Sequence, residues 1–319
     1  MHIPDGMLST PVAVVADVGA VAALTYSVRW IRTKLSDKKL VLMAVLGALI
    51  FALQMLNFPV AGGTSGHFGG GTLAAITCGF WPASVVMSAV LGIQALVFSD
   101  GGILAFGANV LNMGIIAPAV GWLIWRAATR IGGQSKTARI IGAGIAAWAG
   151  TVVSAAAVAF EIWISGHANF ALVFGAMVGW HALIGIGEGV ITAALVGYLL
   201  AVRPDLLDDG VLADRIKGSL RSVLVTLGIV AVAAAGVSWL ASSSPDGLEF
   251  VYFDSGIGKA FRELSLIGDG TVFADYGVRG FGNEALGTVL AGIVGLVLVA
   301  ALLWVLFAPK TRKQPARGN

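Results

Sequence analysis

Long apolar runs, separated by short polar segments, dominate the chain. The runs that approach the thickness of a bilayer core fall near residues 10–30, 40–57, 72–98, 103–126, 139–164, 170–201, 220–241 and 285–308. A helix that crosses a membrane needs about 20 predominantly apolar residues. The pattern therefore predicts an all-α fold, in which a polytopic bundle of helices spans a membrane.

The basic residues between these runs predict how the bundle is oriented. Lys and Arg gather in four regions, 29–39, 126–139, 203–221 and 310–317. Short loops rich in Lys and Arg mark the cytoplasmic side of a membrane. We therefore expect a multi-pass protein of a bacterial or archaeal cell (inner) membrane, with the N-terminus and the loop 58–71 external and the C-terminus cytoplasmic.

The run 72–98 does not fit one simple crossing. The loop before it and the turn 99–102 after it are both expected outside, so the run must enter and leave on one face. Pro82 cannot continue a helix because it lacks an N–H group, so a break between Gly79 and Pro82 is predicted, with a short or broken helix on each side. Broken helices at membrane depth are tolerated where they line a cavity or are buried in protein. With this pair, about seven helices precede residue 205 and two follow it.

The composition of the chain changes after this helical region. A stretch of mixed acidic and basic residues, 206–217, predicts a cytoplasmic linker between a first unit, 1–205, and a second unit, 218–319. The second unit contains two apolar runs joined by a polar external loop, 242–284. We therefore expect a C-terminal unit of two helices with an external loop.

The overall composition supports the membrane class. The chain is 57% hydrophobic and only 12% charged, with a net charge of +3, whereas soluble domains are about a quarter charged. Membrane lipid is thus an expected partner and nucleic acid is not. The one cysteine, Cys78, cannot support a disulfide framework or a zinc knuckle. Because the first residues carry no basic region typical of a signal peptide, we expect Met1 to begin the mature protein.

His2 has the most distinctive chemistry in the sequence. With Met1 it offers three nitrogens in a row, the Met1 α-amine, the His2 amide and the His2 imidazole. Chelate rings of five and six members would hold these nitrogens in one plane around a metal. A fourth nitrogen would complete a square plane, which is typical of Ni(II) or Cu(II) rather than of Zn(II). Since the amide must lose its proton, binding should release protons.

His67 is the best candidate for the fourth nitrogen. It lies in the external, glycine-rich stretch 62–71, and glycines at this density allow the backbone to approach a buried site closely. Asn109 and Asn112 are polar residues inside an apolar run and could orient a ligand imidazole. Hydrogen bonding between helices is an equally good explanation for both asparagines.

Other ionisable residues within the apolar runs are weaker candidates. His181 and Glu188 are seven residues apart on one predicted helix and so share a face. Intramembrane ionisable groups are functional candidates by default, but here a structural or coupling role is favoured. Asp17 and Glu161 are similar cases, and His167 is expected to lie in a solvated loop.

These residues resemble a known family. The resemblance to the CbiM/NikM family, the substrate-capture components of energy-coupling-factor transporters for cobalt and nickel, covers about residues 1–205. Residues 218–308 resemble the small partner subunit CbiN/NikN. The chain therefore looks like a fusion of the two. The segments that carry the resemblance are 1–6 (MHIPDG), 66–67 (GH), 109–113, 181–188, 245–249 (PDGLE) and 273–277.

The resemblance implies a transport component rather than an enzyme, and no cofactor. Its substrate would be Ni²⁺ (or Co²⁺), captured at the outer face in a square-planar nitrogen site made by Met1, His2 and His67. A transmembrane coupling subunit and cytoplasmic ATPase subunits would supply energy, since the chain carries no Walker A motif. The small residues Ala44, Ala48 and Ala52 could seat the coupling subunit.

Two alternatives remain open at this stage. Gly63-Thr64-Ser65-Gly66 matches the G-x-S-G pattern of rhomboid intramembrane serine proteases, and His181 could be the base. A vitamin-binding component of the same transporter class is the other. An N-terminal extension would distinguish both alternatives from the metal hypothesis. It would abolish chelation by the α-amine but leave a serine nucleophile or a vitamin pocket largely intact.

Overall fold

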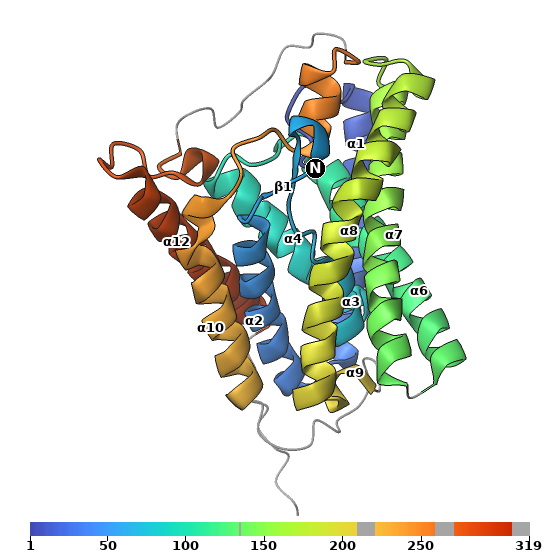
Figure 1. Cartoon of the computed structure of the whole chain (residues 1–319), viewed down its shortest axis with the longest axis vertical. Helices are drawn as coiled ribbons and strands as arrows, with labels where there is room; N and C mark the ends of the chain where they lie inside the picture. The colour runs from blue at the N-terminus through green and yellow to red at the C-terminus, as the bar shows by residue number, and fades with distance from the viewer. Residues whose placement is uncertain (134, 209–220, 259–270, 308–319) are drawn as a thin grey trace, which may run out of the picture.

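The chain forms a bundle of helices that run roughly parallel to its long axis (Figure 1). The structure, a computed structural model, describes residues 1–133, 135–208, 221–258 and 271–307. Six helices in these ranges are long and apolar enough to cross a membrane. They are Thr10–Lys34, Phe80–Val97, Phe106–Gly132, Lys136–Ile164, Phe170–Val202 and Glu284–Phe307. The all-α membrane bundle predicted from the sequence is confirmed.

The first part of the chain contains the predicted seven helices. They are α1 (Thr10–Lys34), α2 (Asp37–Gln54), α3 (Gly71–Cys78), α4 (Phe80–Val97), a continuous run of α5 (Phe106–Asn109), η2 (Val110–Ile116) and α6 (Ala117–Gly132), then α7 (Lys136–Ile164) and α8 (Phe170–Val202). The segment η2 is a π-helix, an element that occurs frequently at functional sites.

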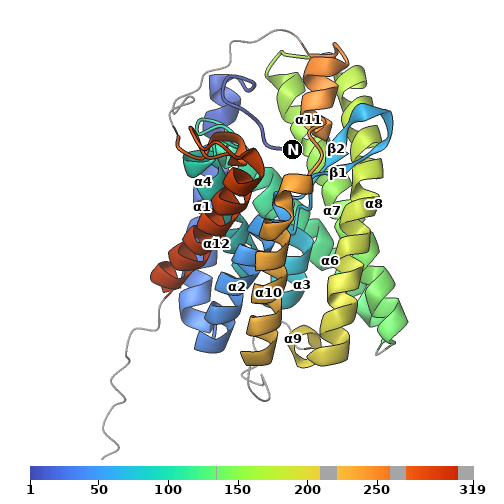
Figure 2. The same cartoon turned by 60° about the vertical axis from the view of Figure 1, so that its left-hand side comes forward.

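The second part contributes two long helices. They are α10 (Arg221–Gly236) and α12 (Glu284–Phe307), and both pack against α2 (Figure 2). The shorter elements are α9 (Asp205–Asp208), η4 (Ser238–Leu240), α11 (Gly247–Glu249), η5 (Phe250–Asp254) and η7 (Ala274–Tyr276). Most of the predicted linker 206–217 lies outside the described residues, as do residues 218–220 and 308–319 of the predicted second unit.

The break in the run 72–98 is present and lies at Gly79. This residue has φ 92°, and it both ends α3 and precedes α4. Glycine adopts this left-handed backbone conformation readily, whereas other residues do so at a cost. Pro82 lies in the first turn of α4, where a missing N–H breaks no helical hydrogen bond. All residues of the short helix α3 are buried, as expected for a broken helix within a membrane protein.

The packing around α2 corrects one expectation. Ala44, Ala48 and Ala52 are buried, because the helices around α2 include α10, α12 and α4. The contact with α12 is close, since a Cβ on Gly47 would lie 2.6 Å from the Leu303 side chain. The small-residue stripe therefore packs within this chain and is not available to a coupling subunit. By contrast, α1 exposes an apolar face that includes Val15 and Val18, as expected for contact with lipid.

Candidate metal centre

The N-terminal segment enters the bundle and is fixed there by Asn109. The Ile3 amide donates to Asn109 Oδ1 at 2.8 Å, and Asn109 Nδ2 donates to the Ile3 carbonyl at 3.0 Å. The Asp5 carboxylate accepts hydrogen bonds from the amides of Leu104 and Ala105. Ile3 is fully buried as a result. These contacts hold the first residue of the chain inside the bundle, in the half away from α9, where the N-terminus is marked in Figure 1.

The structure brings the predicted ligands Met1 and His67 together. The Met1 amine lies 2.9 Å from His67 Nε2. His67 Nδ1 lies 3.3 Å from the Phe68 carbonyl, which can only accept, so Nδ1 carries the ring proton in the neutral form. The Nε2 lone pair is therefore directed toward the Met1 amine. These are two of the four predicted nitrogens, side by side.

His2 lies beside them, with its ring stacked on that of His67. The ring centroids are 5.3 Å apart and the planes are inclined by 18°. His2 Nδ1 lies 3.0 Å from Asp100 Oδ1, and Nε2 lies 3.2 Å from Gln94 Oε1. The nitrogen predicted to bind metal, Nδ1, thus faces Asp100. For Nδ1 to bind the metal, its contact with Asp100 must be replaced by the bond to the metal. The Gln94 contact is available to orient the ring through its other nitrogen.

A pair of buried glutamines supports this arrangement. Gln94 Nε2 donates to Gln54 Oε1 at 2.8 Å and to the Tyr276 hydroxyl at 3.0 Å. Gln54 Nε2 donates in turn to the Gly69 carbonyl at 2.8 Å. With its amide nitrogen occupied in this way, Gln94 presents its oxygen to His2. Neither glutamine was predicted as a site residue from the sequence, although a polar residue inside an apolar helix is a usable signal.

The C-terminal part of the chain contributes Asp246 to the same site. Asp246 forms an ion pair with the Met1 ammonium and lies 4.0 Å from His67 Nε2. It also begins α11 with a capping box, in which its side chain accepts from the Glu249 amide while Glu249 accepts from the Asp246 amide. Ser65 in β2 (Ser65–Gly66), which pairs with β1 (Phe58–Pro59), forms a parallel bridge with Asp246. The motif at 245–249 is thus explained by a turn that brings a carboxylate to the N-terminus.

The electrostatics of the site favour a cation. Burial, assisted by the Met1 ammonium, lowers the pKa of His67 to about 3, so the ring stays neutral and can act as a ligand. Burial would raise the pKa of Asp246, but the Met1 ammonium and His67 hold it well below its usual range. The pKa of Asp100 is also held low, against the effect of burial, by His2 and Tyr276. Two ionised carboxylates therefore flank the predicted nitrogens.

The donors at this site combine side-chain and main-chain nitrogens. In the described ranges, no group of three or more His, Cys, Asp and Glu side chains is arranged to hold a metal ion. The nitrogens that do converge are the Met1 amine and the His67 imidazole, with the His2 ring beside them. The His2 amide belongs to the same two-residue segment.

The asparagines have partners other than a ligand imidazole. Asn109 holds the backbone of Ile3, as described above. Asn112 Nδ2 donates to Glu161 Oε2 at 2.7 Å, which links η2 to α7. Asn109 therefore positions the N-terminal segment, whereas Asn112 connects two helices, so the alternative explanation, hydrogen bonding between helices, applies to Asn112 alone.

Glu188 and Ser65 have structural contacts. The Glu188 carboxylate accepts from the amides of Gly69 and Gly70 and so anchors the loop that carries His67. The Ser65 hydroxyl is fully buried and donates to the Ser244 carbonyl at 2.8 Å. A serine bound in this way joins two segments of the chain, and the geometry of a protease nucleophile with a histidine base is not observed at Ser65.

Comparison with known proteins identifies the family of the chain. Residues 2–206 match the family described as the cobalt uptake substrate-specific transmembrane region, CbiM, and residues 221–312 match the PDGLE domain. The chain belongs to the CbiM family of membrane proteins for metal uptake, and it carries a PDGLE domain after that region. Neither the protease nor the vitamin-binding alternative fits this membership.

Relatives with the same two-part organisation exist. The putative fused nickel transport protein NikMN of Archaeoglobus fulgidus is 37% identical over 95% of this chain and 96% of its own length. The fused nickel transport protein NikMN of Rhodobacter capsulatus is 32% identical over 94% of this chain and 95% of its own length. A crystal structure of a truncated transition metal transporter superposes with a TM-score of 0.57 at 35% identity, covering 63% of this chain and 99% of that one.

Proposed function

We propose that this chain captures Ni²⁺, or Co²⁺, at the outer face of the cell membrane as the substrate-binding component of an ATP-driven uptake transporter. The Met1 amine, the His2 amide, the His2 imidazole and the His67 imidazole would form a square-planar site. The observation that carries this proposal is the 2.9 Å separation of the Met1 amine and His67 Nε2. With metal–nitrogen bonds of about 2 Å, neighbouring corners of a square plane are about 2.8 Å apart.

The choice of metal rests on the donor set and on the relatives. A planar arrangement of four nitrogens suits Ni(II) and disfavours zinc, which prefers a tetrahedron. Two relatives that cover nearly the whole chain are described as fused nickel transport proteins. Shorter relatives are described as cobalt transport proteins, for example that of Geobacter sulfurreducens, 31% identical. The longer relatives therefore favour nickel over cobalt as the substrate of this chain.

Capture from the outside is supported by the distribution of charge. The helix ends that carry Arg32, Arg130 and Arg203 belong to the end of the bundle where α9 lies, away from the N-terminus (Figure 1). By the positive-inside rule this end faces the cytoplasm. In the other half of the bundle, a cavity of about 430 Å³ is lined in part by His2 and His67. Its lining also includes four carboxylates, Asp100, Asp246, Glu249 and Asp275. This outer vestibule would attract a cation.

The transport step would depend on other chains. A transmembrane coupling subunit and cytoplasmic ATPases would supply the energy, with residues 1–205 as the capture unit and 218–319 as an accessory unit joined by the linker 206–217. The domain matches at 2–206 and 221–312 support this division. The contact between Asp246 and Met1 supports a role for the accessory unit in metal loading.

Calorimetry on the purified full chain tests the ligand set. His2→Ala and His67→Ala should each weaken nickel binding by at least about 100-fold, because loss of a ligand costs more than loss of a group that orients one. A short N-terminal extension should have the same effect, since it converts the α-amine into an amide. His167→Ala, in the α7–α8 loop, is the matched control and should bind normally. Unchanged binding by the extended chain would refute amine ligation.

A further inference from the structure

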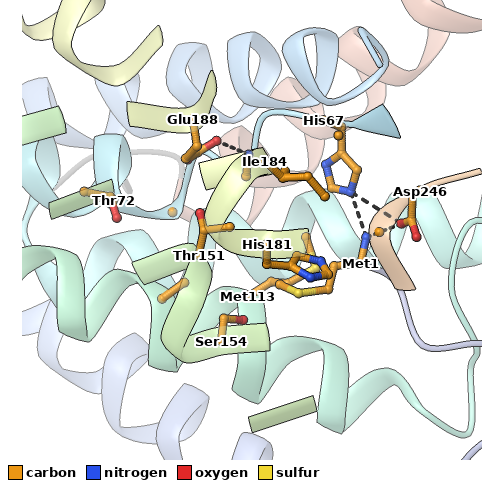
Figure 3. Close-up of a pocket in the computed structure, with 15 residues that line it drawn as sticks. Met1, His67, Thr72, Met113, Thr151, Ser154, His181, Ile184, Glu188 and Asp246 are labelled. Carbon is orange, nitrogen blue, oxygen red and sulfur yellow. Dashed lines mark hydrogen bonds and ion pairs between the residues drawn. The ribbon is translucent and has the colours of Figure 1, made fainter. Parts of the chain in front are cut away.

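A second cavity continues from the candidate metal centre into the bundle (Figure 3). Its lining includes Met1, His67 and Asp246 of the candidate metal centre, His181 beside Met1, and Glu188 farther along α8. Its volume is about 40 Å³, and because a water molecule needs about 10–15 Å³ of such space, it holds about three waters. An ion with an octahedral shell of about six waters does not fit. An ion that enters must therefore exchange water for protein ligands.

His181 offers a nitrogen ligand in this cavity. Its side chain is buried on α8, and Nδ1 lies 2.8 Å from the Met177 carbonyl. A carbonyl only accepts, so the neutral ring carries its proton on Nδ1 and keeps the lone pair on Nε2. In the part of the chain that the structure describes, His181 makes no other hydrogen bond. A buried imidazole with an unused acceptor nitrogen thus borders the cavity.

The PDGLE segment covers this nitrogen. A Cβ on Gly247 would lie 2.8 Å from His181 Cε1 and 3.0 Å from Nε2, so only glycine allows the backbone to pack this closely on the ring. The preceding residue, Asp246, pairs with the Met1 ammonium. One dipeptide therefore covers both the amine of the capture site and the lone pair of His181, and its displacement would expose both nitrogens together.

Glu188 supplies the negative charge that a cation needs within an apolar bundle. It lies two turns beyond His181 on the same face of α8 and lines the same cavity. Its carboxylate is held by the amides of Gly69 and Gly70, so it is connected to the loop that carries His67. A divalent ion at this depth is stable only with such compensation.

We propose that His181 Nε2, with Glu188 as its charge partner, forms an inner station that receives the metal ion from the capture site. This inference rests on the proposed function and extends it by one step. The ion leaves the planar nitrogens and is bound by His181 when Asp246 and Gly247 move aside. The inner station has fewer nitrogen ligands than the capture site and binds more weakly, as suits an intermediate position.

Binding of Co²⁺ to a chain without the capture site tests the station directly. The background is the full chain with an N-terminal extension, His2→Ala and His67→Ala, and visible absorption reports nitrogen ligation of the added Co²⁺. One weak site is expected. It should disappear in the same background with His181→Phe and persist with His167→Phe, and size-exclusion profiles and melting temperatures confirm that the variants fold. A cobalt spectrum that His181→Phe leaves unchanged overturns the proposal.

Uptake by cells that make the complete transporter provides the second test. His181→Phe in the otherwise unchanged chain should retain equilibrium nickel capture and lose uptake by roughly tenfold or more. His181→Cys, which restores a metal-binding side chain, should recover part of the uptake, which a purely structural role for the ring does not explain. Normal uptake by His181→Phe overturns the inner station alone, whereas full binding by His2→Ala and His67→Ala overturns the capture site.

Discussion

The nitrogen of Met1 has two partners in the structure, and both affect how it can bind metal. His67 Nε2 lies 2.9 Å away, and Asp246 forms an ion pair with the ammonium form. An ammonium cannot act as a ligand, so the proton and the metal compete for this nitrogen. The same competition applies to the His2 amide. His67 does not take part in it, because burial lowers its pKa to about 3 and the ring is already neutral.

Nickel binding should therefore release protons, one of them from the His2 amide, which keeps its proton unless it is a ligand. Binding should weaken as the pH falls, since protons then compete more strongly with the metal for the ligand nitrogens, and His67 should add to this loss only as the pH approaches about 3. Calorimetry in buffers with different enthalpies of ionisation measures the number of protons. Binding without proton release would contradict ligation by the amine and the amide.

At the residue scale the sequence indicated the candidate ligands but not the residues around them. The chelate of Met1 and His2 follows from covalent structure, so it is visible without a fold. The prediction that His67 lies near Met1 depended on the glycine-rich loop around His67 and on placing that loop on the same side of the membrane as the N-terminus. Asp246 could not be assigned, because its approach to Met1 depends on pairing between segments about 180 residues apart, Ser65 in β2 and residues 244–246.

At the scale of elements, helix positions were predictable and the finer breaks were not. A helix must have a minimum apolar length to cross a bilayer, so the bounds of the long helices can be predicted within a few residues. The predicted runs agree in this way with α1, α4, α7, α8 and α12. The break in the run 72–98 was also predicted. It lies at Gly79 because the chain there needs positive φ, which matters more than the missing N–H of Pro82. The hairpin of β1 and β2 was missed, since strands this short carry no periodic pattern.

The break itself can be tested with two glycine substitutions. Gly79→Ala should destabilise the protein by about 1–2 kcal/mol, because an L-residue is strained at φ 92°. Gly92→Ala is the control within α4, where a Cβ would meet only ordinary contacts at 3.8 Å and alanine favours a helix by roughly 0.5–1 kcal/mol. Thermal unfolding in detergent compares them. Equal melting temperatures would mean that the chain can pass from α3 to α4 without positive φ.

At the scale of the whole molecule, the outer vestibule gathers carboxylates from both parts of the chain. Asp100 follows α4, whereas Asp246, Glu249 and Asp275 come from the C-terminal part. Charges of one sign around a cavity raise the rate at which a counter-ion arrives, and salt weakens this effect. The C-terminal part thus adds attraction for cations to a site whose predicted ligands all come from the N-terminal part.

Removing two of these charges should slow capture of nickel. The double variant Glu249→Gln and Asp275→Asn should reduce the association rate several-fold at low salt and progressively less at higher salt, with a smaller change in the equilibrium constant. Stopped-flow measurements of nickel binding over a range of ionic strength detect this. Asp254→Asn is the control, because Asp254 is exposed and does not line the vestibule. An association rate in the double variant that equals that of the control at low salt would contradict electrostatic attraction.

The bridge between Ser65 and Asp246 has a consequence for assembly. A segment that belongs to the same polypeptide as the strand it pairs with is present at one copy per capture site. Its effective concentration is therefore high, in the millimolar range for a short flexible connection. A docking contact as small as this one can then stay formed even if its intrinsic affinity is weak. Expressed as two separate polypeptides, the same halves would associate in proportion to their abundance, and a capture unit without its partner would leave the amine and His181 uncovered.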